Sequence, residues 1–85
     1  MSIKFTKQAE KNYQKLPLAI QKKADKQFSF LASDYRHPSL RTRKMGIEDK
    51  FEARIDYHYR FIFLIEGEDV FILTVGMHDE GLGKK

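Results

Sequence analysis

The spacing of apolar residues changes once along the chain, near Met45, and this change limits the possible folds more than any other feature. Before it, apolar residues recur at the spacing of amphipathic helices. The first helical stripe contains Ala9, Tyr13 and Leu16. The second contains Ile20, Ala24, Phe28, Leu31 and Tyr35. The first half of the chain therefore predicts two helices, each with one apolar face.

The ends of these helices are marked by residues that favour helix termini. Thr6 offers an N-cap hydroxyl for the first helix, and Pro17 suits the first turn of a second helix over residues 17–34. Because the two stripes follow each other so closely, we expect the helices to form an antiparallel hairpin. Ahead of them, polar and apolar residues alternate over residues 2–5, which predicts a short N-terminal strand.

After Met45 the pattern becomes that of β-strands. In KFEARID, residues 50–56, apolar and charged residues alternate, which predicts a half-buried strand with a charged outer face. RFIFLI (60–65) and VFILTV (70–75) are apolar on both faces and flank EGED (66–69), which predicts a hairpin. The order β-α-α-β-β-β predicts an α+β domain in which a helical hairpin packs on a small, mostly antiparallel sheet.

The hairpin also predicts which strand positions face each other. Continuing the ladder back from a tight turn at residues 66–69 places Arg60 opposite Val75. In that register His78 projects from the face of the sheet opposite to Arg60. We therefore expect a β-bulge at Gly76 that turns the histidine toward the arginine.

Length and composition predict a single domain, residues 1–85. A chain of 85 residues buries roughly 60 to 65% of the surface that its unfolded form exposes, which leaves room for one modest core. With zero cysteines, disulfides and cysteine-based metal sites are excluded, so packing has to supply the stability. No apolar run has the length of a signal peptide core or a membrane span, and we expect a cytoplasmic protein.

Charge is distributed unevenly over the chain, whose net charge is +4. Residues 1–44 carry 11 Lys and Arg against three acids, which gives +8, whereas residues 45–85 carry five against nine, which gives −4. We expect the scattered helical lysines to form a solvated face; these are Lys7, Lys11, Lys15, Lys22, Lys23 and Lys26. RHPSLRTRK, residues 36–44, differs because four basic residues and a histidine stand together without an acid. It predicts an exposed basic loop that attracts polyphosphates.

The predicted strand ends bring candidate site residues together. Arg54 and Arg60 stand six positions apart at the ends of neighbouring strands, Tyr57 and Tyr59 lie between them, and His78 follows the last strand. Cationic donors beside an imidazole suit an anionic substrate, with the histidine moving a proton near neutral pH.

The same residues also have a purely structural interpretation. His78 would then be a residue at the surface or at the edge of the core, Arg54 would pair with Glu52, Asp56 or another acid, and the tyrosines would only pack. A metal site is not expected at residues 78–80, His-Asp-Glu, because they are contiguous and lack a second histidine at ligand spacing.

The order of elements, the segment FEARIDYHYRFIF and the ending TVGMH resemble the RelE/ParE superfamily of bacterial toxin-antitoxin toxins. The pattern covers nearly the whole chain, and the specific similarity lies in residues 50–80. The arginine spacing and the strand-end histidine are most similar to the HigB and YafQ-like branch. Gly76 and Met77 depart from that branch, which tends to have an acid and a tyrosine there.

The resemblance implies a fold and an activity. It implies a metal-independent endoribonuclease, without a cofactor, that uses the RNA 2′-hydroxyl to cut mRNA in the ribosomal decoding site. It also implies an antitoxin protein, which we expect to be acidic or amphipathic, that holds the toxin inactive. His78 corresponds to a general acid or base, Arg60 to the main phosphate clamp and Arg54 to a second clamp or an orienting residue.

Further residues correspond more loosely to the family's RNA-binding surface. Arg41, Arg43 and Lys44 of the basic loop are expected to bind RNA or the ribosome, and Tyr57 or Tyr59 to stack on a base. Two other functions remain open. One is a ParE-like inhibitor of DNA gyrase, and the other is a non-catalytic module that only binds a partner protein.

Overall fold

The computed structural model describes residues 1–46 and 48–77. Its elements follow in the order β1 (Ser2–Phe5), α1 (Lys7–Gln14), α2 (Leu18–Ser33), the 3-10 helix η1 (Pro38–Leu40), β2 (Arg43–Met45), β3 (Lys50–Arg54), β4 (Tyr59–Glu66) and β5 (Asp69–Met77). The predicted α+β architecture, a helical hairpin on a mostly antiparallel sheet, is confirmed.

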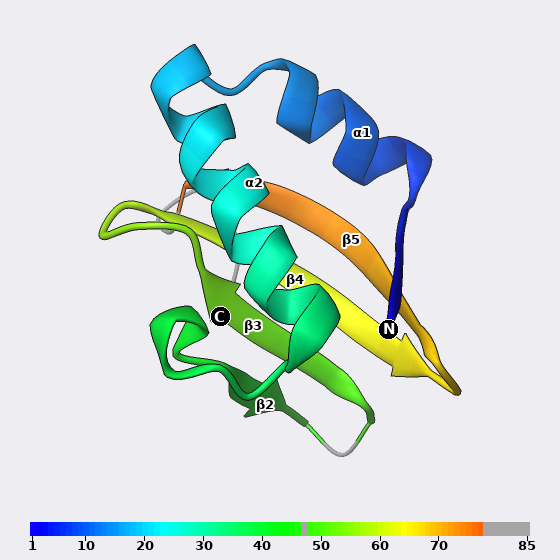
Figure 1. The fold of residues 1–85 in the computed structure, drawn as a ribbon. Helices are drawn as coiled ribbons and strands as arrows, with labels where there is room; N and C mark the ends of the chain where they lie inside the picture. The colour runs from blue at the N-terminus through cyan, green and yellow to red at the C-terminus, as the bar shows by residue number, and fades with distance from the viewer. Residues whose placement is uncertain (47, 78–85) are drawn as a thin grey trace.

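The sheet has the strand order β1-β5-β4-β3-β2, and both helices lie on one of its faces (Figure 1). β1 runs parallel to β5, and all other neighbouring strands in this sheet are antiparallel. β1 and β2 therefore form its two edges. In the described part of the chain, neither helix is long and apolar enough to cross a membrane.

Thr6 starts α1 as the sequence predicts. Its hydroxyl oxygen accepts the N–H of Ala9 at 3.0 Å, which satisfies one of the free donors at the helix start. Pro17 is the N-cap of α2 rather than a residue of its first turn. Leu16 falls in the short connection between the helices, yet its side chain still packs against the core.

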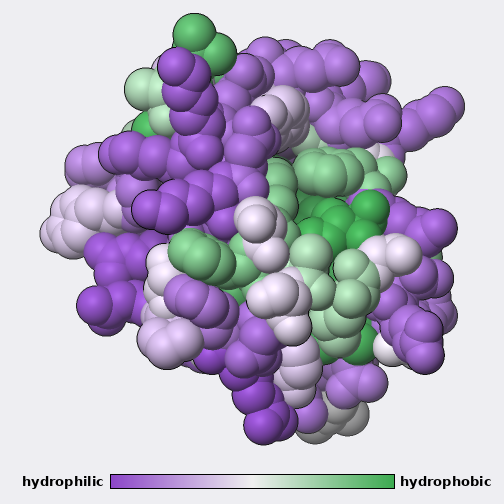
Figure 2. All heavy atoms as spheres, in the orientation of Figure 1, coloured by the Kyte–Doolittle hydropathy of each residue, from purple (hydrophilic) through white to green (hydrophobic). Residues whose placement is uncertain are grey.

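The core lies between α2 and the central strands. Phe28 of α2 meets Phe61 of β4 edge to face, with ring centroids 5.0 Å apart, and Phe61 and Phe63 are fully buried. Figure 2 shows the helical face of the molecule covered largely by hydrophilic side chains, with an apolar patch beside α2. The packed face of the sheet is therefore the face that the helices cover.

The predicted basic loop is partly a strand. Arg43 and Lys44, which the sequence places in an exposed loop, form the short edge strand β2 together with Met45. These three residues pair with Glu52, Phe51 and Lys50 of β3. Three residues with two charged side chains give little hydrophobic signal, and a charged edge strand is a common protection against unwanted strand pairing.

The predicted register of the β4–β5 hairpin is correct near the turn and wrong at the site. Pairing shifts between Ile62 and Phe63, so Arg60 faces Gly76 instead of Val75. The extra residue is Leu73, and the bulge expected at Gly76 is displaced to this position.

Contacts with the start of the helical hairpin explain the place of the bulge. The hydroxyl of Thr6 donates to the carbonyl oxygen of Leu73 at 3.0 Å, and the Asn12 side chain accepts the N–H of Val75 at 3.0 Å. Thr6, between β1 and α1, and Asn12, on α1, thus satisfy backbone groups around the bulge at Leu73.

Candidate functional site

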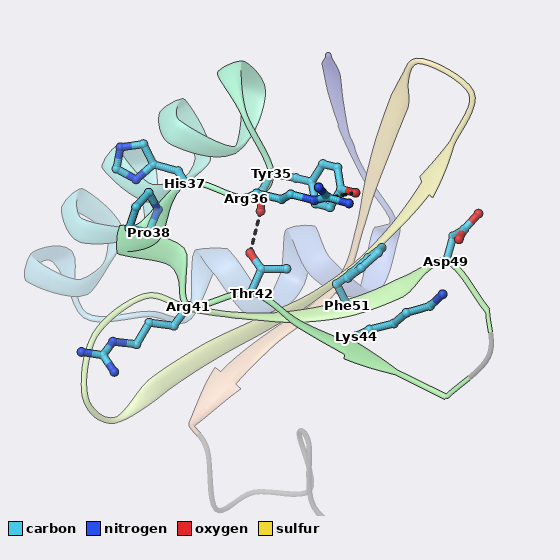
Figure 3. A pocket seen from close by; sticks show the side chains of 9 residues that line it. All are labelled: Tyr35, Arg36, His37, Pro38, Arg41, Thr42, Lys44, Asp49 and Phe51. Atoms are coloured by element: carbon cyan, nitrogen blue, oxygen red, sulfur yellow. Dashed lines mark hydrogen bonds between the residues drawn. The ribbon is translucent and has the colours of Figure 1, made fainter.

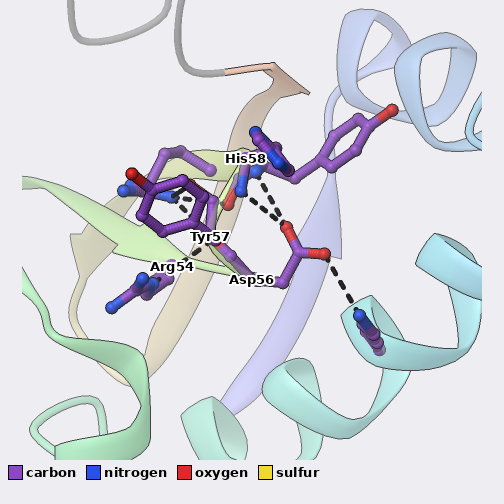
Figure 4. Close-up of polar contacts among 7 residues, drawn as sticks. Arg54, Asp56, Tyr57 and His58 are labelled. Carbon is purple, nitrogen blue, oxygen red and sulfur yellow. Dashed lines mark hydrogen bonds and ion pairs between the residues drawn. The ribbon is translucent and has the colours of Figure 1, made fainter.

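The loop between β3 and β4 is organised by the carboxylate of Asp56. Its Oδ1 accepts the backbone N–H groups of His58 at 2.9 Å and Tyr59 at 3.0 Å (Figure 4). Its Oδ2 lies 3.3 Å from Nζ of Lys23 on α2. The loop is therefore closed by an Asx-type turn and tied to the helical layer, which sets the ends of both strands in place.

These contacts lower the pKa of the Asp56 carboxyl. Partial burial raises that pKa, but the N–H groups of His58 and Tyr59 and the ammonium of Lys23 together outweigh burial, and the net shift is downward. Because the folded-state pKa lies below the unfolded one, the resulting stabilisation is present above the usual aspartate range. It is lost as the pH falls through the folded-state pKa.

Asp56→Asn is expected to lower the free energy of unfolding by about 1 kcal/mol at pH 7, since asparagine keeps the acceptor oxygen but loses the charge. The difference from the unchanged protein should shrink as the pH falls below about 4. Urea unfolding over a pH series measures this difference in the free energy of unfolding, and Glu68→Gln in the exposed β4–β5 turn is the control. A difference that stays constant down to strongly acidic pH would contradict the assignment.

Arg54 and Arg60 face each other directly across β3 and β4. Nη1 of Arg60 donates to the carbonyl oxygens of Asp56 (2.7 Å), Tyr57 (3.1 Å) and Tyr59 (3.2 Å), so this guanidinium holds the loop. Arg54 donates from Nε to the carbonyl oxygen of Asp56 at 3.3 Å, and its guanidinium carbon lies 5.8 Å from the centroid of the Tyr57 ring. Arg60 is thus the more constrained of the two.

The two arginines have no carboxylate partner among the described residues. The ion pairs found there join Lys23 with Asp56, Arg43 with Glu52 and Lys50 with Glu48. In the described residues, Arg54 therefore does not form the ion pair with Glu52 or Asp56 that the structural interpretation predicts. Two like charges facing each other across a ladder repel, and a bound phosphate would offset that repulsion.

A groove with a volume of about 650 Å³ opens beside Arg54, between α2, η1 and the β3–β4 loop. We call it the Arg54 groove; its lining includes Lys23, Lys26, Arg41, Arg54, Asp56 and Tyr57. The only carboxylate of the described lining, that of Asp56, is bound to Lys23. Tyr57 is 73% exposed, so its ring is open to stacking. The groove therefore combines an accessible aromatic face with three cations that have no carboxylate partner among the described residues, Lys26, Arg41 and Arg54. This suits an anionic, ring-bearing ligand.

Gln27 of α2 joins three parts of the groove wall. Its side chain is 5% exposed, and Nε2 donates to the carbonyl oxygens of Ser39 (3.0 Å) and Arg54 (2.7 Å). Its Oε1 accepts the hydroxyl of Ser39 at 3.0 Å. The end of β3 is thereby locked to η1 through one buried amide whose donors and acceptor are used.

The basic loop contributes to two different surfaces. Arg41 lines the Arg54 groove and also a second groove, shown in Figure 3, that includes Lys44. Arg43 points elsewhere and binds Glu52, with 2.9 Å between Nη2 and Oε1. Because neighbouring strand residues project to opposite faces, β2 separates Arg43 from Lys44.

The two tyrosines predicted for the site are not brought together with each other in the described structure. Tyr59 lines a pocket with Asn12 and Leu16, on the side of the α1–α2 connection, whereas Tyr57 lines the Arg54 groove. His78 lies outside the described residues. Among residues 1–46 and 48–77, no group of three metal-ligating side chains occurs.

Three groove residues were missed in the sequence. Lys23 and Lys26 appear as part of a solvated helical face, but the fold turns them toward the end of β3. Gln27 did give a signal, because it is a polar residue between Ala24 and Leu31 on an otherwise buried stripe. A buried amide in such a position has to find hydrogen-bond partners in another element.

Comparisons with known proteins point to one group. A sequence model described as "ParE toxin of type II toxin-antitoxin system, parDE" matches residues 3–81. No curated protein matches the chain significantly.

Solved structures with the same fold come from bacteria and archaea. The YoeB/ParE toxin from Agrobacterium tumefaciens is 13% identical with a TM-score of 0.80, and the similarity covers 92% of this chain and 99% of that one. RelE–RelB from Pyrococcus horikoshii is 22% identical with a TM-score of 0.78, covering 94% and 97%. The intact E. coli RelBE toxin-antitoxin complex is 18% identical with a TM-score of 0.77, covering 93% and 98%.

Proposed function

The chain belongs to the ParE toxin family of type II toxin-antitoxin systems, and from this premise we propose that it is an endoribonuclease that cuts mRNA on the ribosome. The observation that carries the proposal is the pair Arg54 and Arg60, which face each other without a carboxylate partner in the described structure. Arg54 opens into a groove lined by further cations and by Tyr57. This arrangement fits a ribose-phosphate unit with its base on the tyrosine ring.

The proposed reaction takes its nucleophile from the RNA. The 2′-oxygen attacks the neighbouring phosphorus, the bond from phosphorus to the 5′-oxygen breaks, and a 2′,3′-cyclic phosphate and a 5′-hydroxyl result. A base accepts the 2′-hydroxyl proton, and an acid gives a proton to the leaving 5′-oxygen. We assign His78 to one of these proton transfers.

The arginines act on the phosphate. Charge accumulates on its oxygens as the new bond forms, and guanidinium donors fixed beforehand stabilise that charge more than they stabilise the substrate. Arg60 is fixed by three carbonyl oxygens through Nη1 alone, so its other nitrogens can be aimed at a ligand without losing the loop. Because a lysine cannot hold a loop and a phosphate in this forked manner, Arg60→Lys is not a conservative change.

An antitoxin partner is also proposed. The E. coli RelBE and Pyrococcus horikoshii RelE–RelB structures are toxin-antitoxin complexes. In this chain β1 and β2 leave two sheet edges, and Leu18 on α2 is 67% exposed. An added strand or an amphipathic helix would cover such features, and acidic side chains on it would compete with RNA for the groove.

A second candidate function is inhibition of DNA gyrase, which the family resemblance implies for ParE-like toxins, and the matching model is described as a ParE toxin. It requires binding only, without a general acid or base. The predicted similarity to the HigB and YafQ-like branch, which favours RNA cleavage, stays a prediction.

Induced expression separates the two functions. If the chain is a ribosome-dependent endoribonuclease, translation stops, new mRNA 5′ ends appear within coding regions, and purified protein cuts naked RNA only weakly. The double variant His78→Ala with Arg60→Ala should restore growth at the same protein level. Persisting toxicity in that variant would reject the assigned roles, and supercoiling defects with intact mRNA would favour gyrase.

A further inference from the structure

The groove in Figure 3 lies next to the Arg54 groove and has a different character. Its volume is about 570 Å³, and we call it the Tyr35–Phe51 groove; its lining includes Tyr35, Arg36, Arg41, Lys44, Asp49 and Phe51. The rings of Tyr35 and Phe51 are 5.3 Å apart between centroids, inclined at 52°. Both side chains are only partly buried, so they form an aromatic floor with cations around it.

The two grooves share a wall. Pro38 and Arg41 line both of them, and η1 stands between the two. Arg41 ends η1 with φ of +49°, a left-handed conformation that costs an arginine roughly 1 kcal/mol or more. An exposed cation held in this conformation between two cavities can reach a ligand that passes from one to the other.

The wall is rigid before any ligand arrives. The ring of His37 stacks on Phe30 with centroids 3.9 Å apart, and its Nδ1 accepts the N–H of Ser39 at 3.1 Å. Gln27 binds Ser39 from the other side. The Thr42 hydroxyl donates to the Tyr35 carbonyl oxygen at 2.6 Å, which also fixes the floor of the groove.

The cations of this groove are not used by the fold. Within the described residues, no ion pair includes Arg36, Arg41 or Lys44. The guanidinium of Arg36 lies 5.3 Å from the centroid of the Tyr35 ring and donates from Nε to its hydroxyl, which leaves its terminal nitrogens for a ligand. Among the residues that the structure describes, Asp49 is the only carboxylate in the lining.

From this geometry we infer that the Tyr35–Phe51 groove is a second nucleotide subsite, which holds single-stranded RNA as it leaves the Arg54 groove across Arg41. The inference rests on the proposed function for the class of ligand. Single-stranded nucleic acid is bound by cations that follow its backbone and by aromatic rings that stack on its bases, and this groove has both. An acidic protein segment would use the cations but not the aromatic floor.

The test uses eight-nucleotide 2′-O-methyl RNA, which cannot be cleaved because its 2′-oxygen is blocked. Arg36→Gln with Lys44→Gln removes two cations of the groove, and Lys7→Gln with Lys11→Gln removes two cations of α1 as the matched control. The first pair is expected to weaken binding about 10- to 30-fold at 0.1 M salt. It should also reduce the slope of log affinity against log salt by about 1.4, because two phosphate contacts are lost.

A second arm tests the aromatic floor. Two further RNAs carry abasic positions, one in its 5′ half and the other in its 3′ half. Each is expected to bind the unchanged protein about 5- to 100-fold more weakly than intact RNA, because one half of the strand occupies the Tyr35–Phe51 groove. Polyglutamate of equal charge has no bases to stack on Tyr35 and Phe51 and should therefore bind weakly.

Three results would overturn the inference: equal losses in the α1 control pair, an unchanged salt slope, or polyglutamate that binds as tightly as RNA. Because the ligand is not cleavable, the outcome does not depend on nuclease activity. If the protein does not cleave mRNA but the RNA-binding results are as expected, the proposed reaction is rejected and the second nucleotide subsite stands. If the variant with Arg36→Gln and Lys44→Gln cleaves mRNA and binds RNA as well as the unchanged protein does, the subsite is rejected and the proposed reaction stands.

Discussion

Arg54→Gln is expected to lower the rate of the proposed ribosome-dependent mRNA cleavage about 100-fold, while the free energy of unfolding changes by less than about 0.5 kcal/mol. In the described structure the side chain makes a single hydrogen bond, of 3.3 Å, so the fold loses little. A fixed donor aimed at developing phosphate charge is worth about 100- to 1,000-fold in rate. Primer extension on mRNA from a translation extract measures the cleavage, and urea unfolding measures the stability.

Arg60→Gln is the informative comparison for this prediction. It removes a cation from the same place, but it also releases three carbonyl oxygens of the β3–β4 loop. Both cleavage and stability should therefore fall, the latter by about 1 to 2 kcal/mol. Lys4→Gln on β1 is the charge-matched control and should change neither quantity. Full cleavage activity in a folded Arg54→Gln variant would refute the role given to this side chain.

Gln27→Leu is expected to lower the free energy of unfolding by about 2 to 4 kcal/mol, because the partly buried carbonyl oxygens of Ser39 and Arg54 then both lose their donor. A loss of this size is a large fraction of the stability of a small domain. Cleavage should fall with it, since η1 and the end of β3 are no longer locked together. Urea unfolding gives the first quantity directly.

Gln21→Leu on the same helix serves as the control for Gln27. Its Nε2 donates one hydrogen bond, of 2.9 Å, to the carbonyl oxygen of Tyr13, and it lies away from both grooves. It should cost about 1 kcal/mol and leave cleavage unchanged. Equal effects of the two substitutions would mean that Gln27 has no special part in the groove wall.

Features set by local pattern were predictable from the sequence. The stripe from Ile20 to Leu31 became the buried face of α2, and Thr6 caps α1 with its hydroxyl. The strands at residues 50–54, 59–66 and 69–77 fall where the apolar spacing placed them. Each of these depends on residues close in sequence, whose periodicity is visible without the fold.

Features set by contacts between distant residues were not predictable in this way. The bulge lies at Leu73 because side chains near the start of the chain satisfy backbone groups there, and this moved the partner of Arg60 by one position. The facing pair Arg54 and Arg60 agrees with the predicted closeness of the two strand ends. Lys23 reaches the site only because α2 packs over the end of β3, a placement that helical periodicity does not contain.

The parallel pairing of β1 with β5 has a consequence for how the protein is made. Among the described residues, Ser2 to Phe5 pair with Asp69 to Ile72, and the N–H of Ser2 donates to the Glu68 carbonyl oxygen. The sheet therefore cannot close before this later segment has been synthesised. A pairing of such high sequence separation is formed late, because the intervening chain must first be ordered. During synthesis the facing arginines Arg54 and Arg60 are therefore present before β1 can join the sheet, and the five-stranded sheet is complete only after residues 69–72 have been made.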